Sequence, residues 1–308
     1  MSNRVVVVGS ANTDMVVRCP RIPAPGETVI GGEFISVPGG KGANQAVAAA
    51  RLGAEVTLIA RIGTDMFGDQ AIEGYRAEGI NVDSIVRDVS APSGVALIIV
   101  DEKNGENSIA VAPGANSRLT PENIGAAEAL IAKADVMLLQ LEVPLETVAA
   151  AVRIARRQDV LVILNPAPAP TLDLPQGLLE SVDVLTPNEF EARRVTGMNS
   201  NATHEAVAAA LLERGVKTVV MTLGANGALV ANAQGMTHVP AFKVNPVDTT
   251  AAGDGFNAGL AVALSYDADD LLGATRYANA VGALTTTRMG AQPSLPTAAS
   301  VEALLTSE

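Results

Sequence analysis

The stretch VMLLQLEVPLETVAAAVRIARRQDVLVIL, from Val136 to Leu164, determines the fold class. Its two ends, Val136 to Gln140 and Val160 to Leu164, are short apolar runs of the kind found in strands that are buried on both faces. Between them, Leu145 to Arg157 is rich in alanine and has apolar residues at helical spacing. A buried strand, a helix and a second buried strand form one βαβ unit, which predicts a parallel sheet.

The same alternation extends along the rest of the chain. Further strands are predicted at Val5–Val8, Val56–Ala60, Val182–Leu185 and Thr218–Thr222, and further helices at Lys41–Arg51 and Thr203–Arg214. We therefore predict an α/β fold with a doubly wound, mostly parallel sheet and helices on both of its faces.

Two regions interrupt this alternation. Residues 12–38 are rich in Pro and Gly and contain a strand-like run from Glu27 to Phe34. Residues 93–111 are typical of a hairpin, in which VALIIV and SIAV flank a turn at Asn104-Gly105. Neither region contains a crossover helix, so both are predicted to form a small β-sheet that covers the core as a lid. The core then comprises residues 1–11, 39–92 and 112–308.

Composition narrows the classes of function. The chain has 308 residues and a formal net charge of -12, which argues against binding to nucleic acid or to an anionic membrane. No apolar run approaches the roughly 20 residues that span a bilayer, so we expect a cytoplasmic protein. One cysteine and two histidines are too few for a typical zinc cluster. Acid–base chemistry is therefore expected to come from Asp or Glu.

Polar residues follow the predicted strands at the point where each one ends. They are Asn12, Asp14, Glu142, Asn165, Asn188, Glu191, Thr222 and Gly224. The carboxyl ends of parallel strands meet at one edge of a sheet, where ligands bind, so we expect these residues to converge there. Singly, each is also consistent with an ordinary turn or helix-cap residue.

The segment PGGKGANQAVAAARLG, from Pro38 to Gly53, is a glycine-rich entry to a buried helix. It is not a P-loop, because Ile35 stands where the first glycine is required and Gly42 follows Lys41 in place of Ser or Thr. Lys41 and Asn44 are candidates for hydrogen bonds to ligand hydroxyls. The alternative is that the glycines serve only a close contact between helix and sheet.

The segment VDTTAAGDGFNAG, from Val247 to Gly259, precedes a second apolar helix. The spacing predicts that this helix begins near Ala252, with Asp254 in its first turn and the amides of Ala251, Ala252 and Gly253 free to bind an anion. Gly253 and Gly255 would leave room beside the acid. A carboxylate beside an anion site suits phosphoryl transfer, in which a base accepts a hydroxyl proton.

The segments DTTAAGDGFNAG and GGKGANQAVAAARLGA closely resemble the two signatures of the ribokinase-like (PfkB) carbohydrate kinases. Further similar segments are VVVVGSANTD, PAPGETV, LLQLEVPLE, LNPAPA, LTPNEFEA, TLGANGA and TRMGAQPS, so the resemblance covers essentially the whole chain. It implies the fold of that family and ATP-dependent phosphorylation of a sugar, with O5 of D-ribose as the expected acceptor.

The resemblance also implies roles for individual residues. Asp254 would be the catalytic base, with the amides of Ala251, Ala252 and Gly253 as the anion hole. The sugar would be bound by Asn12, Asp14, Gly40, Lys41, Asn44, Glu142 and Asp254. ATP would lie along Asn188, Thr222, Gly224, Gly227, Gly253 and Asn279, and Glu191 would act indirectly on its Mg²⁺.

A monovalent-cation site, expected to hold K⁺, is implied beside the anion hole. It would be formed by Asp248, Thr250, Thr285, Arg288, Gly290 and Ser294, several of them through backbone carbonyls. Carbonyl and carboxylate oxygens suit such a hard ion. Taken without the resemblance, TTTRMGAQPS is typical of a helix C-terminus that stops at Gly290.

Two positions depart from the family pattern. Gly255 follows the base where Thr is common, and Thr285 occupies a position often filled by a smaller apolar residue. The family resemblance further implies a homodimer in which the lids of two subunits pack together. Two alternatives to ribose phosphorylation remain open: a kinase for 2-deoxyribose, another sugar or a nucleoside, and a non-catalytic sugar or nucleotide sensor.

Overall fold

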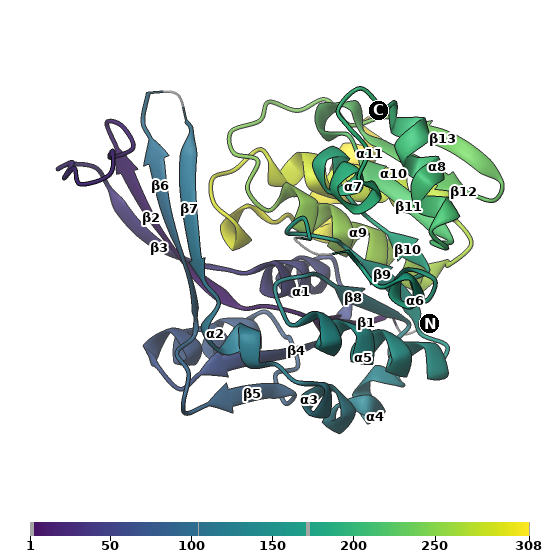
Figure 1. Ribbon diagram of the computed structural model, residues 1–308, viewed down its shortest axis with the longest axis horizontal. Coiled ribbons are helices and arrows are strands. Elements are labelled where there is room, and N and C mark those ends of the chain that lie inside the picture. Colours follow the sequence, from purple (N-terminus) through teal and green to yellow (C-terminus); the bar gives the residue numbers. More distant parts are fainter. Residues whose placement is uncertain (1–2, 104, 171–172, 308) are drawn as a thin grey trace.

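A computed structural model describes residues 3–103, 105–170 and 173–307 (Figure 1). The core is a nine-stranded sheet with strand order β13-β12-β11-β10-β9-β8-β1-β4-β5. All neighbouring strands are parallel except in the β11-β12-β13 meander, which confirms the predicted mostly parallel α/β sheet. The strands are β1 Arg4–Val8, β4 Glu55–Gly63, β5 Ile85–Asp88, β8 Val136–Leu139, β9 Leu161–Leu164, β10 Val184–Leu185, β11 Thr218–Thr222, β12 Ala228–Asn232 and β13 Gly235–Val239.

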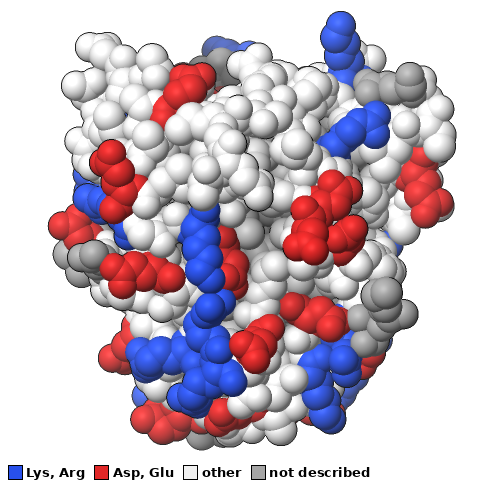
Figure 2. Space-filling view, turned by 90° about the vertical axis from the view of Figure 1, so that its right-hand side faces the viewer, with Lys and Arg blue, Asp and Glu red and all other residues white. Residues whose placement is uncertain are grey.

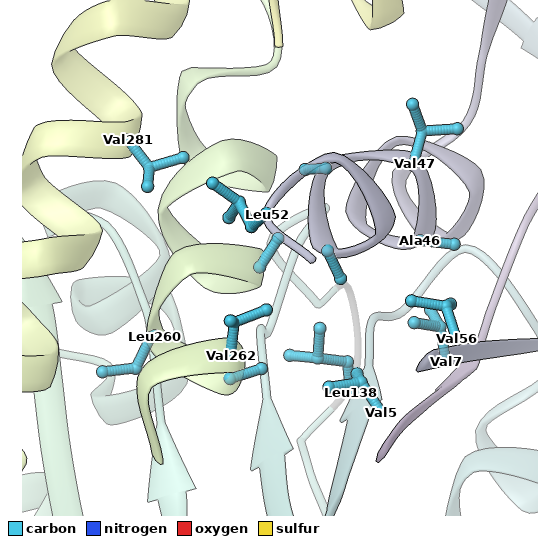
Figure 3. Close-up of a cluster of buried hydrophobic side chains, with 14 of the residues drawn as sticks. Val5, Val7, Ala46, Val47, Leu52, Val56, Leu138, Leu260, Val262 and Val281 are labelled. Atoms are coloured by element: carbon cyan, nitrogen blue, oxygen red, sulfur yellow. The ribbon is translucent and has the colours of Figure 1, made fainter. Parts of the chain in front are cut away.

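Helices cover both faces of this sheet because the central strands bury both sets of side chains. In β1, Val5 and Val7 pack with one layer of helices and Val6 and Val8 with the other. The first layer comprises α1 Lys41–Arg51, α2 Met66–Ala77, α9 Ala252–Tyr266, α10 Leu271–Thr285 and α11 Ala298–Thr306. Figure 3 shows part of it in close-up, where α1, α9 and α10 meet the strands. The second comprises α3 Pro121–Ala126, α4 Glu128–Ile131, α5 Leu145–Arg157, α6 Gln176–Leu179, α7 Glu189–Thr196 and α8 His204–Glu213.

A separate four-stranded sheet stands off the core as the predicted lid (Figure 1). Its order is β3-β2-β6-β7, with strands β2 Asn12–Cys19, β3 Phe34–Gly39, β6 Gly94–Asp101 and β7 Asn107–Ala112. The predicted hairpin is confirmed by the antiparallel pairing of β6 with β7. In its turn, Asn104 lies outside the described residues.

The predicted strand from Glu27 to Phe34 is wrong. Only its last residue is in a strand, because Gly31 and Gly32 have φ of 126° and 101°, which interrupt an extended chain. Gly32 also approaches Arg18 so closely that an added methyl group would lie 1.4 Å from the Arg18 carbonyl oxygen. The strand begins only after this crossing.

The surface of the molecule carries charges of both signs. On the face shown in Figure 2, basic side chains lie among acidic ones. Arg156 and Lys217 both form ion pairs with Asp183. Within the described ranges, no helix has the length and apolar character needed to cross a bilayer.

Helix α1 lies against the end of β1 with no room for a side chain at Gly42. An added methyl group would lie 2.6 Å from the Ser10 nitrogen and 2.7 Å from the Gly9 carbonyl carbon. The alternative interpretation of the glycine-rich segment, a close helix–sheet contact, therefore holds for Gly42. This contact places the first turns of α1 over the end of β1.

We expect Gly42→Ala to lower the free energy of unfolding by about 1–3 kcal/mol, because α1 or the end of β1 must shift to admit the methyl group. Gly74→Ala in α2 is the matched control, since nothing lies within 4 Å of the added methyl group. Alanine is the better helix former, so the control should gain about 0.5–1 kcal/mol. Urea unfolding of both variants measures the difference, and equal effects would contradict the packing role of Gly42.

Candidate active site

The candidate site lies where the strand order of the core sheet reverses. The chain passes from β1 to β4 on one side and later returns to place β8 on the other side of β1. In such sheets the crevice beyond the carboxyl ends of the two strands is the expected ligand site. Ser10 follows β1 and Glu142 follows β8, and the Ser10 hydroxyl donates to Glu142 Oε2 at 2.5 Å.

Glu142 also holds the start of α1. Its Oε2 accepts a hydrogen bond from the Lys41 backbone nitrogen at 3.1 Å. A carboxylate at a helix N-terminus satisfies a free amide and opposes the positive end of the helix dipole. Gly40, which precedes Lys41, has φ of 88° and lies against the backbone of Ala11 and Asn12. The glycine-rich segment is therefore packed on the strand end that it faces.

Helix α9 brings Asp254 to the same crevice. The helix begins at Ala252, with Asp254 in its first turn, as predicted. Its first intrahelical bond is from Gly255 N to Ala251 O, so the amides of Gly253 and Asp254 have no partner within the helix. The expectation that the Ala252 amide is free is wrong, because a tight turn lets it donate to Thr249 O at 3.2 Å.

Asp254 is only 6% exposed, and its carboxylate is held at both oxygens. Oδ2 accepts from Asn44 Nδ2 at 3.0 Å, and Oδ1 accepts from Gln45 Nε2 at 3.1 Å. Both donors are neutral amides of α1. Asp254 thus keeps its acceptor character at a buried position, which is what a general base requires.

The two glycines beside Asp254 differ in what surrounds them. Nothing lies within 4 Å of a methyl group added to Gly253, which agrees with the predicted room beside the acid. For Gly255 that prediction is wrong, since an added methyl group would lie 2.5 Å from the Thr285 hydroxyl oxygen. Gly255 and Thr285 form a close contact between α9 and α10, and the two departures from the family pattern meet there.

Lid strand β2 contributes Asn12 and Asp14, which lie within this strand. Asn12 Oδ1 accepts from Asn116 Nδ2 at 2.7 Å, and Asn116 Oδ1 accepts from the Ala11 nitrogen at 2.9 Å. Asp14 packs against Gly39 of the neighbouring strand, with no space for a methyl group there. The lid is thus joined to the core beside the crevice.

Four carboxylates and one lysine share the site. Burial, followed by the negative charges of Glu142 and Asp254, raises the pKa of Asp14 to about 6. Burial also raises the pKa of Glu191 above its ordinary value. For Lys41, burial opposes the charge, but Asp254, Glu142, Glu191 and Asp14 together raise its pKa. Lys41 is therefore the positive charge around which these acids gather.

Asn188 and Glu191 are joined by reciprocal hydrogen bonds at the start of α7. Asn188 Oδ1 accepts from the Glu191 nitrogen, and Glu191 Oε2 accepts from the Asn188 nitrogen, both at 2.8 Å. This is a capping box, so the helix-cap interpretation holds for both residues. Thr222, at the end of β11, pairs with Asn188 in an isolated bridge.

The remaining residues predicted to lie along ATP follow from β11 onward. Gly224 begins the short helix η2 Gly224–Asn226, and Gly227 ends it with φ of 93° against the Val239 carbonyl. Asn279 of α10 donates from Nδ2 to the carbonyls of Val239 and Pro240, each at 3.1 Å. One side of Asn279 is therefore committed to the backbone, and the nucleotide contacts stay a prediction.

Two residues of the predicted cation site, Thr250 and Gly290, bind Asp248. Its Oδ1 accepts from the nitrogen and hydroxyl of Thr250, and its Oδ2 accepts from the Gly290 nitrogen at 2.8 Å. Burial raises the pKa of Asp248, but the hydrogen bonds from Thr250 and Gly290 outweigh it and lower the pKa below its ordinary value. Thr285 and Ser294 are buried with their hydroxyls bonded to Val281 O and Ala291 O, and Arg288 is exposed.

A model of the pfkB family of carbohydrate kinases matches residues 2–298. The chain belongs to this family. It is 43% identical to a ribokinase of Haemophilus influenzae over 303 residues, which cover 96% of each chain. It is 37% identical to a deoxyribokinase of Salmonella typhi over 294 residues, which cover 95% of each chain. The structure of Arabidopsis thaliana ribokinase complexed with ribose and ATP has a TM-score of 0.89 and 32% identity, with 99% of each chain covered.

In this pfkB-family chain, four polar residues at the site were missed by the sequence reasoning. They are Ser10, Gln45, Asn116 and Gln140, and all four are buried. Two signals in the sequence were available, since Gln45 interrupts an alanine-rich helix and Gln140 ends an apolar strand. A polar side chain at such a position must find a partner inside the protein.

The raised pKa of Asp14 predicts a pH-dependent effect on stability. Between about pH 6 and pH 3.8, Asp14 is protonated in the folded chain but largely ionised in the unfolded chain. The folded state therefore gains stability as pH falls through that window. At pH 7 the ionised Asp14 lowers the free energy of unfolding by on the order of 2–3 kcal/mol. We expect Asp14→Asn to be more stable than the wild type at pH 7, and the gain to shrink below pH 6.

Urea unfolding at pH 7 and pH 5 measures this difference. Asp83→Asn is the matched control, because Asp83 is exposed and should give the same small change at both pH values. A gain for Asp14→Asn that does not depend on pH would contradict the assignment.

Proposed function

We propose that this enzyme transfers the γ-phosphate of ATP to O5 of D-ribose, with Asp254 as the base. The observation that carries the proposal is the environment of Asp254 in a pfkB-family chain. The acid is buried, bonded only to neutral amide donors among the described side chains, and preceded by a helix start with open space at Gly253. A hydroxyl and a phosphate can therefore meet at this residue.

The polar groups around the crevice supply partners for a polyol. Asn44 Oδ1 is buried and has no partner in the described residues, so it is ready to accept from a sugar hydroxyl. Asp14 and Glu142 offer carboxylate oxygens, and Lys41 offers donors. Asn12 has its oxygen bonded to Asn116, which leaves its amide hydrogens for the sugar. We assign ribose binding to these residues and to Gly40.

In the proposed reaction the O5 proton passes to the Asp254 carboxylate as O5 bonds to the γ-phosphorus. The bond to the bridging oxygen breaks, and ADP leaves with that electron pair. The amides of Gly253 and Asp254 would stabilise the charge on the transferring phosphoryl group. Asn188, Thr222, Gly224, Gly227 and Asn279 would lie along the nucleotide. Mg²⁺ would arrive with ATP and neutralise phosphate charge, near Glu191.

We infer a K⁺ site beside the anion hole. An ionised carboxylate has about four acceptor positions, and three protein donors already bind Asp248. The remaining position would suit a singly charged hard ion, together with Thr250, Thr285, Arg288, Gly290 and Ser294, several of them through backbone carbonyls. An ion there would order the chain that leads into Asp254.

The lid supports a homodimer. Ile109 and Val111 of β7 are 55% and 51% exposed. Through the strand pairing they lie on the same face of the lid as Ile35 and Asp14. An exposed apolar sheet face of this kind is typical of a protein interface. Sedimentation velocity should give the mass of two chains for the wild type and of one chain for Ile109→Asp, and a single-chain mass for the wild type would contradict the dimer.

A substrate panel with and without K⁺ tests the function. We expect kcat/KM for D-ribose to exceed that for 2-deoxyribose by at least about 100-fold, because the lost hydroxyl leaves buried polar groups unpaired. The deoxyribokinase relative makes 2-deoxyribose the main competitor, and a preference for it or for a nucleoside would identify that activity instead. Binding of sugar or ATP with no ADP release on any sugar of the panel would point to the sensor alternative.

The K⁺ site is tested by the dependence of the rate on the cation. Rates should rise when KCl replaces tetramethylammonium chloride at constant ionic strength, and Asp248→Asn should remove the difference; equal wild-type rates would count against the ion site.

Asp254→Asn should lower kcat by about 10²–10⁴-fold while ribose and ATP still bind. Near-normal turnover of that variant would exclude Asp254 as the base.

A further inference from the structure

A chain of buried amides leads from the end of strand β8 to the proposed base. Gln140 Nε2 donates to Gln45 Oε1 at 2.5 Å, and Gln45 Nε2 donates to Asp254 Oδ1 at 3.1 Å. Gln45 and Gln140 are both fully buried, with 0% exposure. The two glutamines are therefore shielded from solvent more completely than Asp254, which is 6% exposed.

The chain has a direction that depends on which end of the Gln45 amide faces Asp254. If the amide turned over, its oxygen would face the carboxylate and the hydrogen bond would become a repulsion. Gln140 opposes this reversal because it donates to the Gln45 oxygen. Asn165 also opposes the reversal, because its Oδ1 accepts from Gln45 Nε2 at 3.5 Å. The Asn165 amide is itself held in this direction, since its Nδ2 donates to Thr186 O at 2.9 Å.

Because the two glutamines are buried, the hydrogen bond from Gln45 to Asp254 has no substitute. Water cannot replace a lost hydrogen bond at a site with no exposure, so an unpaired carboxylate oxygen would move toward another donor. The other donor at Asp254 is Asn44 on Oδ2, which is assigned to the sugar. Without Gln45, the carboxylate is held at one oxygen only and can rotate away from the hydroxyl that it must deprotonate. A misplacement of about 1 Å can cost about 100-fold in rate.

We propose that Gln45 and Gln140 are positioning residues for Asp254, and that Gln140 acts through Gln45 by fixing the direction of its amide. This inference rests on the proposed role of Asp254 as the base. It assigns a function to two glutamines that touch neither sugar nor nucleotide in the proposed reaction.

The experiment compares Gln45→Met, Gln140→Met and the double variant by steady-state kinetics with ribose and ATP. Methionine keeps the length of the side chain but cannot donate a hydrogen bond. We expect kcat to fall about 10–100-fold in Gln45→Met, with the KM of both substrates within about threefold of the wild type. Gln140→Met should lower kcat less, and the double variant should be no slower than Gln45→Met, because Gln140 has no other route to Asp254.

Gln140→Glu adds a test of direction. A carboxylate at position 140 only accepts, so it would draw the Gln45 amide hydrogens away from Asp254 and lower kcat below that of Gln140→Met. Thr147→Val is the matched control, because it removes a buried hydrogen bond, from Thr147 Oγ1 to Leu119 O, in the opposite helix layer. It should leave kcat unchanged. Thermal unfolding and calorimetric binding of ribose check that each variant is folded.

Several outcomes would overturn the inference. One is wild-type kcat in Gln45→Met, and another is a double variant whose loss is the product of the two single losses. A third is a raised ribose KM with unchanged kcat, which would make Gln45 a binding residue. If Gln45→Met does not fold, Gln140→Met and Gln140→Glu still decide, since equal kcat in these two and the wild type contradicts the proposal.

Asp254→Asn, measured beside these variants, distinguishes failure of the proposed base from failure of the positioning role. If Asp254→Asn keeps its activity, the assignment of the base fails and the positioning role fails with it. If Asp254→Asn is inactive while Gln45→Met is as fast as the wild type, the proposed function stands and only the positioning role is excluded.

Discussion

The close approach of helix α1 to the end of strand β1 is the contact on which the site depends. Gly42 lies directly against the backbone of Gly9 and Ser10. Because the helix cannot move outward without opening this contact, its first two turns are held over the crevice. Those turns carry the Lys41 amide, which binds Glu142, and the two side chains that bind Asp254. The packing of one glycine thus connects β1, β8, α1 and α9 at a single point.

The site concentrates like charges that the rest of the fold must tolerate. Asp14, Glu142, Glu191 and Asp254 surround one lysine, and burial raises the pKa of Asp14 and of Glu191. Ionised carboxylates with unused acceptor positions are strong acceptors for hydroxyl groups, which is useful for a sugar ligand. They also reduce stability when no ligand is present. Two apolar helix layers, packed on a sheet with both faces buried, supply the stability that offsets this cost.

Local pattern predicted most of the core but not the interior of the site. The bounds of α1 and α5 follow from helical spacing, and those of β11 follow from a β-branched run. Strand β1 begins at Arg4, one residue before the predicted Val5. The strand expected from Glu27 to Phe34 failed because the crossing of Gly32 over Arg18 is a long-range contact that periodicity does not contain. Gly255 was misassigned for a related reason. Its neighbour is Thr285, thirty positions along the chain, in the next helix.

By itself the sequence determined the α/β class, the lid hairpin, the helix start at Ala252 and the candidate base, because each is encoded within one or two turns or strands. The tertiary structure alone decided which of these pieces meet. It paired Ser10 with Glu142, Asn12 with Asn116, and Gln140 with Gln45 across 95 to 132 positions of the chain. Buried polar groups must find partners wherever the fold brings them, and that geometry exists only once the sheet has been assembled.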